Sequence, residues 1–261
     1  MVLDGPDRPV RIVQAGALGR FLGRLDLDLA ADGRVAAHGG DATEMTTALP
    51  EDATAAATLA GFGAGLAEVR RRPVGRAAPG FSNATCRGAE CGIGNLLADA
   101  MLAAVPGAEV AVQNAGGIRA GLPEGVVTYG DILTVLPFGN ALATLRIRGA
   151  HLLEALENGL SQPEAGRFPQ VAGMRLSWNP SAPAGRRIVS AEVGGQPLDP
   201  ARAYLVVTND FMRRGGDGYA AFRDHALEAY DTGPLLEEVV AAHIGGLGTA
   251  QPRSEGRVTR L

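Results

Sequence analysis

Residues 208–219 read Thr208-Asn-Asp-Phe211-Met-Arg-Arg-Gly215-Gly-Asp217-Gly-Tyr219 and follow a strand-like run at 203–207. The loop places Phe211, three glycines and Asp217 close together in sequence. Glycine takes positive φ at little cost and lets the backbone approach a bound group. A ring and a carboxylate on such a loop suit a planar ligand that carries hydroxyls, as a nucleoside does. Taken alone, Gly-Gly-Asp-Gly is also an ordinary turn sequence.

Further motifs upstream of this loop give it a context. In order they are Cys86-Arg87-Gly-Ala-Glu-Cys91-Gly-Ile-Gly-Asn95, Asn114-Ala-Gly116-Gly117-Ile-Arg119, the run from Thr128 through Asp131 to Pro137-Phe138-Gly139-Asn140, and Phe168-Pro-Gln170-Val171-Ala-Gly173. Together with the loop at 208–219, this series resembles the C-terminal domain of the 5'-nucleotidase family, which includes ecto-5'-nucleotidases and periplasmic UDP-sugar hydrolases. The resemblance runs from about residue 83 to the C-terminus, where Gly256-Arg-Val258 resembles the last strand of the family.

The resemblance implies that two aromatic rings sandwich a nucleobase. The matching residues are Phe138 and Phe211, and stacking is worth about 1–3 kcal/mol per base. Asp217 matches the acid that accepts hydrogen bonds from the ribose hydroxyls. Judged from the residues alone, core packing is the alternative for either phenylalanine.

The remaining ligand contacts also follow from the resemblance. Arg87, Asn114 and Arg119 match residues that contact nucleoside and phosphate, and an arginine fork grips phosphate in a bidentate manner. Gly116 and Gly117 are expected to let the backbone pass close to the ligand, although a simple turn is the alternative. Because the chain contains no lysine and all 24 basic residues are arginines, an arginine here can also be ordinary surface charge.

Cys86 and Cys91 enclose four residues. From the residues alone they could be a reduced pair packed as small hydrophobes or a disulfide. A metal site is less well supported, since the chain has no other cysteine and no histidine nearby in sequence. The resemblance favours a disulfide, because some 5'-nucleotidases carry a bridge with this spacing. A bridge implies an oxidising compartment, so we expect a secreted, periplasmic or extracellular protein, although residues 1–8 lack the features of a signal peptide.

Composition limits the classes of function. The 261 residues are 46% hydrophobic, which is enough for one sizeable core or a domain and a half. The net charge of −4 gives no electrostatic reason to expect nucleic acid or an anionic membrane as a partner. No apolar run approaches the roughly 18–20 residues of a membrane span.

Periodicity and cap signals predict alternating elements and a mixed α/β (α+β) class. Thr128 with Asp131 resembles an N-cap and its third-position acid, opening a short helix that stops before Pro137. Asp32-Gly33 is a hairpin signal. Helices are predicted over 53–69, 95–104, 151–160 and 235–244, and strands over 25–29, 110–113, 174–178 and 203–207.

The first 50 residues belong to a different part of the family architecture. Residues 9–26 resemble the closing strands of the N-terminal metallophosphatase domain, which gives domains of 1–50 (remnant), 51–79 (linker helix and candidate hinge) and 80–261 (substrate-binding domain). The family builds a two-metal centre from Asp-x-His, Asn-His-Glu/Asp and Gly-His-x-His motifs, and none occurs here. The four histidines are spread widely and lack paired acids in sequence; they are His38, His151, His225 and His243.

The expected function is nucleotide recognition within a 5'-nucleotidase-type phosphohydrolase of nucleotide catabolism. This chain would bind the nucleotide or nucleoside and contain no catalytic residue and no metal ligand. Two divalent metals would be bound by a missing or separate metallophosphatase domain, so the chain alone would be inactive. The alternatives are a non-catalytic nucleotide-binding module and a relative that hydrolyses another ester, as a thiosulfohydrolase-like protein does. A dinucleotide-binding loop at Gly92-Ile-Gly94 is disfavoured, because Leu97 occupies the third glycine position.

Overall fold

The computed structural model describes residues 2–4, 9–16 and 19–261 and divides into two compact units, residues 1–64 and 65–261. Ala17 and Leu18, which belong to the stretch that resembles the metallophosphatase strands, lie outside the described residues. So do residues 1 and 5–8 of the N-terminal segment that lacks signal-peptide features. The two units are described separately.

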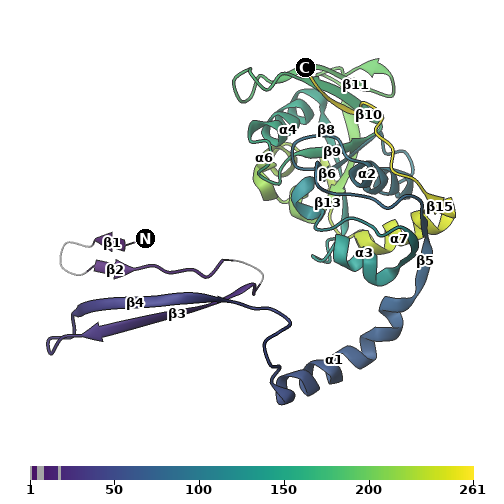
Figure 1. Cartoon of the computed structure of the whole chain (residues 1–261). Helices are drawn as coiled ribbons and strands as arrows, with labels where there is room; N and C mark the ends of the chain where they lie inside the picture. Colours follow the sequence, from purple (N-terminus) through teal and green to yellow (C-terminus); the bar gives the residue numbers. More distant parts are fainter. Residues whose placement is uncertain (1, 5–8, 17–18) are drawn as a thin grey trace. The chain divides into compact units, whose positions relative to one another are not determined.

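The first unit consists of two strand pairs and the start of a long helix (Figure 1). Strand β1 (Val2–Asp4) pairs with β2 (Pro9–Arg11), and β3 (Phe21–Leu29) pairs antiparallel with β4 (Val35–Glu44). The turn between β3 and β4 contains Gly33 at φ +77°, as the hairpin signal predicts. Every side chain of β3 is exposed, and helix α1 (Ala53–Arg71) buries none of its residues.

A five-stranded sheet forms the centre of the second unit. Its strand order is β14 (Glu228–Tyr230), β8 (Leu142–Arg148), β13 (Ala203–Asn209), β6 (Val110–Asn114) and β9 (Pro169–Ala172). Strand β13 runs parallel to β6 and antiparallel to β8. All five side chains of β6 are buried, which requires a covered sheet on both faces.

Helices cover this sheet. Helix α2 (Gly92–Ala104) packs against β6, β9 and α7 (Leu236–Leu247), whereas α4 (Gly149–Ser161) packs against β8, β9 and α6 (Ala220–Asp224). The apolar residues of α4 recur at helical spacing, and Leu152, Leu156 and Leu160 are fully buried. Among the described residues, no helix combines the length and the apolar character that crossing a bilayer requires.

Two smaller sheets complete the unit. One has the order β15 (Thr249–Ala250), β5 (Pro73–Ala77) and β7 (Gly125–Thr128). The other has the order β12 (Gln196–Pro197), β11 (Ile188–Val193), β10 (Met174–Trp178) and β16 (Val258–Arg260). Strand β10 alternates buried and more exposed residues, as its sequence predicts, and β16 is the expected last strand.

Most predicted elements are present, with shifts at their ends. Helix α3 (Tyr129–Val135) begins at the predicted capping box, in which Thr128 Oγ1 accepts from the Asp131 N–H and the Asp131 carboxylate accepts from the Thr128 N–H. Helix α2 begins three residues before the predicted start, because Cys91 is its N-cap and Cys91 Sγ accepts a hydrogen bond from the Gly94 N–H. The mixed α/β class is confirmed.

Candidate nucleotide site

A cavity of about 340 Å³ in the second unit brings the predicted ligand residues together. This volume falls in the range of small-molecule sites. The eight predicted residues all line it: Arg87, Asn114, Gly116, Gly117, Arg119, Phe138, Phe211 and Asp217. Three further lining residues, Asn140, Ala165 and Gly166, were not assigned from the sequence.

Two neighbouring strands deliver most of these residues to one edge of the sheet. Strands β6 and β13 are parallel, so their carboxyl ends meet at the same edge. The 3₁₀ turn η1 (Ala115–Gly117) follows β6 directly. Helix α5 (Asp210–Arg213) and the turn η2 (Gly216–Gly218) follow β13. The carboxyl ends of strands in an open α/β sheet are the usual place for a ligand.

The carboxylate of Asp217 is held in place by a residue from the other strand end. Asn114 Nδ2 donates to Asp217 Oδ2 over 2.6 Å, and Asn158 Nδ2 on α4 donates to the Asp217 backbone carbonyl over 3.1 Å. Asp217 adopts φ +53°, in the left-handed region. Its second carboxylate oxygen, Oδ1, accepts no hydrogen bond from the described part of the chain and can accept from a ligand hydroxyl.

A buried network of three amides lies behind this contact. Asn209 Nδ2 donates to Gln113 Oε1 and to Asn114 Oδ1, each over 3.0 Å. Asn209 is also the N-cap of α5, because its Oδ1 accepts from the Met212 N–H over 2.8 Å. Gln113, Asn114 and Asn209 are all buried. The network therefore orients Asn114 and, through it, Asp217.

Two glycines are required by the protein itself at this site. A β-carbon at Gly117 would lie 2.5 Å from Gln113 Nε2, inside the amide network. A β-carbon at Gly216 would lie 2.5 Å from Cζ of Phe211. The ring of Phe211 thus packs directly over the backbone of the Gly-Gly-Asp-Gly loop. These contacts explain both glycines without a ligand.

The two candidate stacking rings are not part of the core. Phe138 is 60% exposed and Phe211 is 45% exposed, although both are large apolar side chains. The core alternative for these two residues is therefore excluded. Exposed rings on the wall of one cavity suit contact with a planar ligand.

Two arginines supply positive charge at the cavity. Arg119 lies with its guanidinium carbon 5.9 Å from the centre of the Phe138 ring and donates a long hydrogen bond of 3.4 Å to the Gly116 carbonyl. The side chain of Arg87 forms no ion pair with any residue that the structure describes. Both arginines are exposed and therefore free to meet an anionic group.

A disulfide between Cys86 and Cys91 closes the loop that carries Arg87. The buried side chain of Gln170 forms hydrogen bonds with the backbone of the same loop. Gln170 Nε2 donates to the Cys86 and Ala89 carbonyls, and Gln170 Oε1 accepts from the Cys91 N–H. The loop is thus attached both covalently and by buried hydrogen bonds.

Reduction of this bridge should loosen the loop without unfolding the unit. On the chain-entropy model a loop this short gains about 2 kcal/mol from its crosslink. We expect protein made in an oxidising compartment to show no free thiol when it is alkylated under denaturing, non-reducing conditions, and two thiols after reduction. Two alkylated cysteines without a reductant would contradict the bridge.

Tyr219, at the end of the loop, has a structural role. Its ring is fully buried and stacks on Phe222, and its hydroxyl donates to the Arg167 carbonyl over 2.7 Å. Burial raises the pKa of Tyr219, and the negative charge of Asp217 raises it further. Tyr219 anchors the loop and does not line the cavity.

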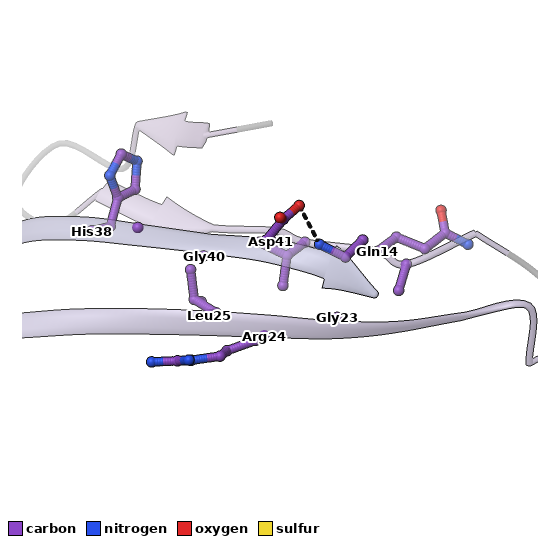
Figure 2. A pocket seen from close by; sticks show the side chains of 11 residues that line it. Gln14, Gly23, Arg24, Leu25, His38, Gly40 and Asp41 are labelled. Atoms are coloured by element: carbon purple, nitrogen blue, oxygen red, sulfur yellow. Dashed lines mark hydrogen bonds between the residues drawn. The ribbon is translucent and has the colours of Figure 1, made fainter. Parts of the chain in front are cut away.

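A larger hollow of about 580 Å³ lies along the β3–β4 hairpin of the first unit (Figure 2). Its walls are formed by exposed or half-exposed residues. Asp41 accepts a hydrogen bond from the neighbouring Ala42 N–H over 2.7 Å (Figure 2), and Arg24 donates to Asp26 over 2.9 Å. Because these polar groups already have partners in the hairpin, the hollow offers less to a ligand than the cavity in the second unit.

One cluster of side chains, formed by His151, Glu154 and His225, was not predicted from the sequence. The rings of His151 and His225 stack, and Glu154 lies beside both. The two histidines come from different elements, and only the fold brings them together. The expectation that the histidines lack paired acids in sequence is wrong for His151, because Glu154 lies three residues later on the same helix and forms an ion pair with it.

Comparison with known proteins identifies similar sequences and structures. A family model described as "5'-nucleotidase, C-terminal domain" matches residues 73–224. Trifunctional nucleotide phosphoesterase protein YfkN of Bacillus subtilis is 34% identical over 273 residues, which cover 98% of this chain and 18% of that protein. A 5'-nucleotidase of Diplobatis ommata is 29% identical over 282 residues, which cover 99% of this chain and 48% of that protein.

Among solved structures, the 5'-nucleotidase precursor of Thermus thermophilus superposes with a TM-score of 0.81 at 36% identity. The match covers 100% of this chain and 54% of that one. The chain thus spans about half or less of the length of these relatives.

Proposed function

Since this chain belongs to the 5'-nucleotidase family through its C-terminal domain, we propose that it is the nucleotide-recognition part of a 5'-nucleotidase-type hydrolase. In this role Phe138 and Phe211 bind the base, and Asp217 accepts hydrogen bonds from the ribose hydroxyls. Arg87, Asn114 and Arg119 contact the nucleoside and the phosphate. The complete enzyme would convert a nucleoside 5'-phosphate to nucleoside and phosphate.

One observation supports this proposal above the others. Eight residues from four separate sequence motifs line a single cavity. The cavity combines two exposed rings, one carboxylate oxygen without a protein partner and two exposed arginines. Rings suit a base, a carboxylate suits hydroxyls, and guanidinium groups suit phosphate. A nucleotide carries all three of these groups.

The family's reaction depends on metal, and the described residues do not fit a two-metal centre. Two ions require several carboxylate, imidazole and amide ligands around both. In residues 2–4, 9–16 and 19–261 the one group with enough potential ligands near one another is His151, Glu154 and His225, and it does not line the cavity. We therefore assign the two divalent metals to a metallophosphatase domain outside this chain, and no catalytic step to this chain.

Binding can be tested directly on the chain. Titration calorimetry with adenosine monophosphate should give one site per chain, and Asp217→Asn should weaken it because an amide replaces an acceptor oxygen by a donor. A ligand with a base but no ribose hydroxyls should bind equally to the wild type and to Asp217→Asn. Absence of binding by adenosine, its monophosphate and a sugar nucleotide alike would contradict the proposal.

Hydrolysis by this chain alone should be absent. The cavity offers positioning, which can supply several kcal/mol of rate in the complete enzyme. Among the described residues, none of those that line it belongs to a group of metal ligands that could activate water for attack on phosphorus. We expect phosphate release from adenosine monophosphate to equal the blank with magnesium, manganese or zinc present. Metal-dependent release that Glu154→Gln or Asp217→Asn abolishes would refute this expectation.

The compartment proposed for the protein is extracytoplasmic, either periplasmic or extracellular. The disulfide between Cys86 and Cys91 supports it, because such bridges persist in oxidising environments. A non-catalytic nucleotide-binding module is the second candidate function.

A further inference from the structure

The cluster of His151, Glu154 and His225 joins two helices on the surface of the second unit. His151 lies in the first turn of α4 and Glu154 one turn later, whereas His225 is the C-cap of α6. The two imidazole rings stack with centroids 3.7 Å apart and an interplanar angle of 15°. Glu154 Oε2 lies 3.2 Å from His151 Nδ1 and 3.8 Å from His225 Nε2.

We propose that these three side chains bind one Zn²⁺ ion. Each of them offers a ligand atom, and the three atoms lie within 4.8 Å of one another. Two ligands of a tetrahedral zinc ion are roughly 3.3 Å apart when zinc–nitrogen bonds are 2.0–2.1 Å long. Glu154 Oε2 meets this value within 0.1 Å at His151, 3.2 Å away, and lies 3.8 Å from His225. Because the two rings are stacked and nearly parallel, one imidazole has to rotate out of the stack before both ring nitrogens can direct their in-plane lone pairs at one ion.

Two imidazoles and one carboxylate favour zinc over magnesium and calcium. Imidazole nitrogen with one carboxylate is a common donor set for zinc and its neighbours in the first transition row. Magnesium and calcium prefer sites made of oxygen atoms. Asp224, next to His225, is engaged on both carboxylate oxygens by Arg223, over 2.7 and 3.0 Å. The protein therefore offers three ligands, and solvent can fill the remaining position, since all three side chains are partly exposed.

A zinc ion here would crosslink the segment that follows the nucleotide loop. Helix α6 begins directly after Tyr219, two residues beyond Asp217. Helix α4 carries Asn158, which donates to the Asp217 carbonyl. Both helices joined by the ion thus contact or adjoin the loop that carries the candidate ribose ligand. The site is proposed independently of the nucleotide function.

Equilibrium dialysis of the chelator-treated chain against zinc chloride alone tests the proposal. We expect one zinc per chain. Loss of an outer-shell partner weakens a metal site about 10–100-fold, so loss of a direct ligand through His151→Ala or His225→Ala should weaken zinc binding at least as much. His243→Ala on α7 is the matched control, because it removes a histidine outside the cluster and should leave the affinity unchanged. Magnesium chloride alone should not bind at this cluster.

Thermal melting distinguishes a metal site from an ion pair without metal. Zinc at 100 times its dissociation constant should raise the melting temperature of the wild type by roughly 5–10 °C and that of the histidine variants hardly at all. Glu154→Gln keeps the side-chain volume, so it tests the carboxylate if an alanine variant folds poorly. Zinc binding that all three cluster variants leave unchanged, or no zinc binding by the wild type, would overturn the proposal.

Discussion

Phe211→Ala should lower the affinity for adenosine about 5- to 160-fold, which corresponds to about 1–3 kcal/mol of lost stacking. The melting temperature should hardly change. Phe211 is 45% exposed and packs over the backbone of Gly216, so its truncation opens no core cavity. A buried phenylalanine would instead lose about 3–5 kcal/mol of stability on the same change. Calorimetric titration and thermal melting of the same preparation measure both quantities.

Phe62→Ala is the matched control for this experiment. Phe62 lies on α1, is 75% exposed and does not line the cavity. Its truncation should change neither adenosine affinity nor melting of the second unit. Should Phe211→Ala lower the melting temperature sharply while the affinity of the folded protein stays the same, the stacking role is wrong and the nucleotide proposal weakens with it.

Asn209→Ala should destabilise the second unit by about 2–4 kcal/mol and also weaken nucleotide binding. The change removes the N-cap of α5, and it leaves Gln113 Oε1 without its donor in a buried position. Asn114 loses one of the partners that orient it toward Asp217. Urea unfolding can be followed by the fluorescence of Trp178, the single tryptophan of the chain, which is buried in this unit.

The control for Asn209→Ala is the same substitution at Asn179. Asn179 Oδ1 accepts one exposed hydrogen bond, from the Ser181 N–H over 2.9 Å. Its loss should change the unfolding free energy by no more than about 0.5 kcal/mol. A loss below about 1 kcal/mol at Asn209 would show that the amide network does not hold the loop.

Local signals in the sequence were sufficient for most elements of the second unit. Thr128 and Asp131 predict the start of α3 correctly, because both partners of a capping box lie within one turn. The start of α2 was predicted too late, since a bridged cysteine is not among the usual N-cap residues. A capping box can be predicted from the spacing of its two residues within one helix, whereas an unusual N-cap residue depends on the surrounding fold.

The candidate site was predictable only where its residues carry distinctive side chains. Phe211 and Asp217 belong to a recognisable motif, but Ala165 and Gly166 offer the cavity little beyond backbone and small surface. The Gly166 carbonyl accepts from the Gly116 N–H over 2.6 Å, a contact that no sequence pattern encodes. The stacking of His151 on His225 was missed for a related reason, since it depends on how α4 and α6 pack.

At position 217, thermal stability and ligand binding favour different residues, because the backbone there is left-handed. An L-residue other than glycine at φ +53° costs roughly 1 kcal/mol or more, although aspartate and asparagine tolerate it better than most. Selection for heat resistance alone would therefore favour glycine at position 217, which relieves the backbone but discards the carboxylate. An engineering programme that enriches stable variants should hold this position constant, because stability gained there would come from dismantling the candidate ribose contact.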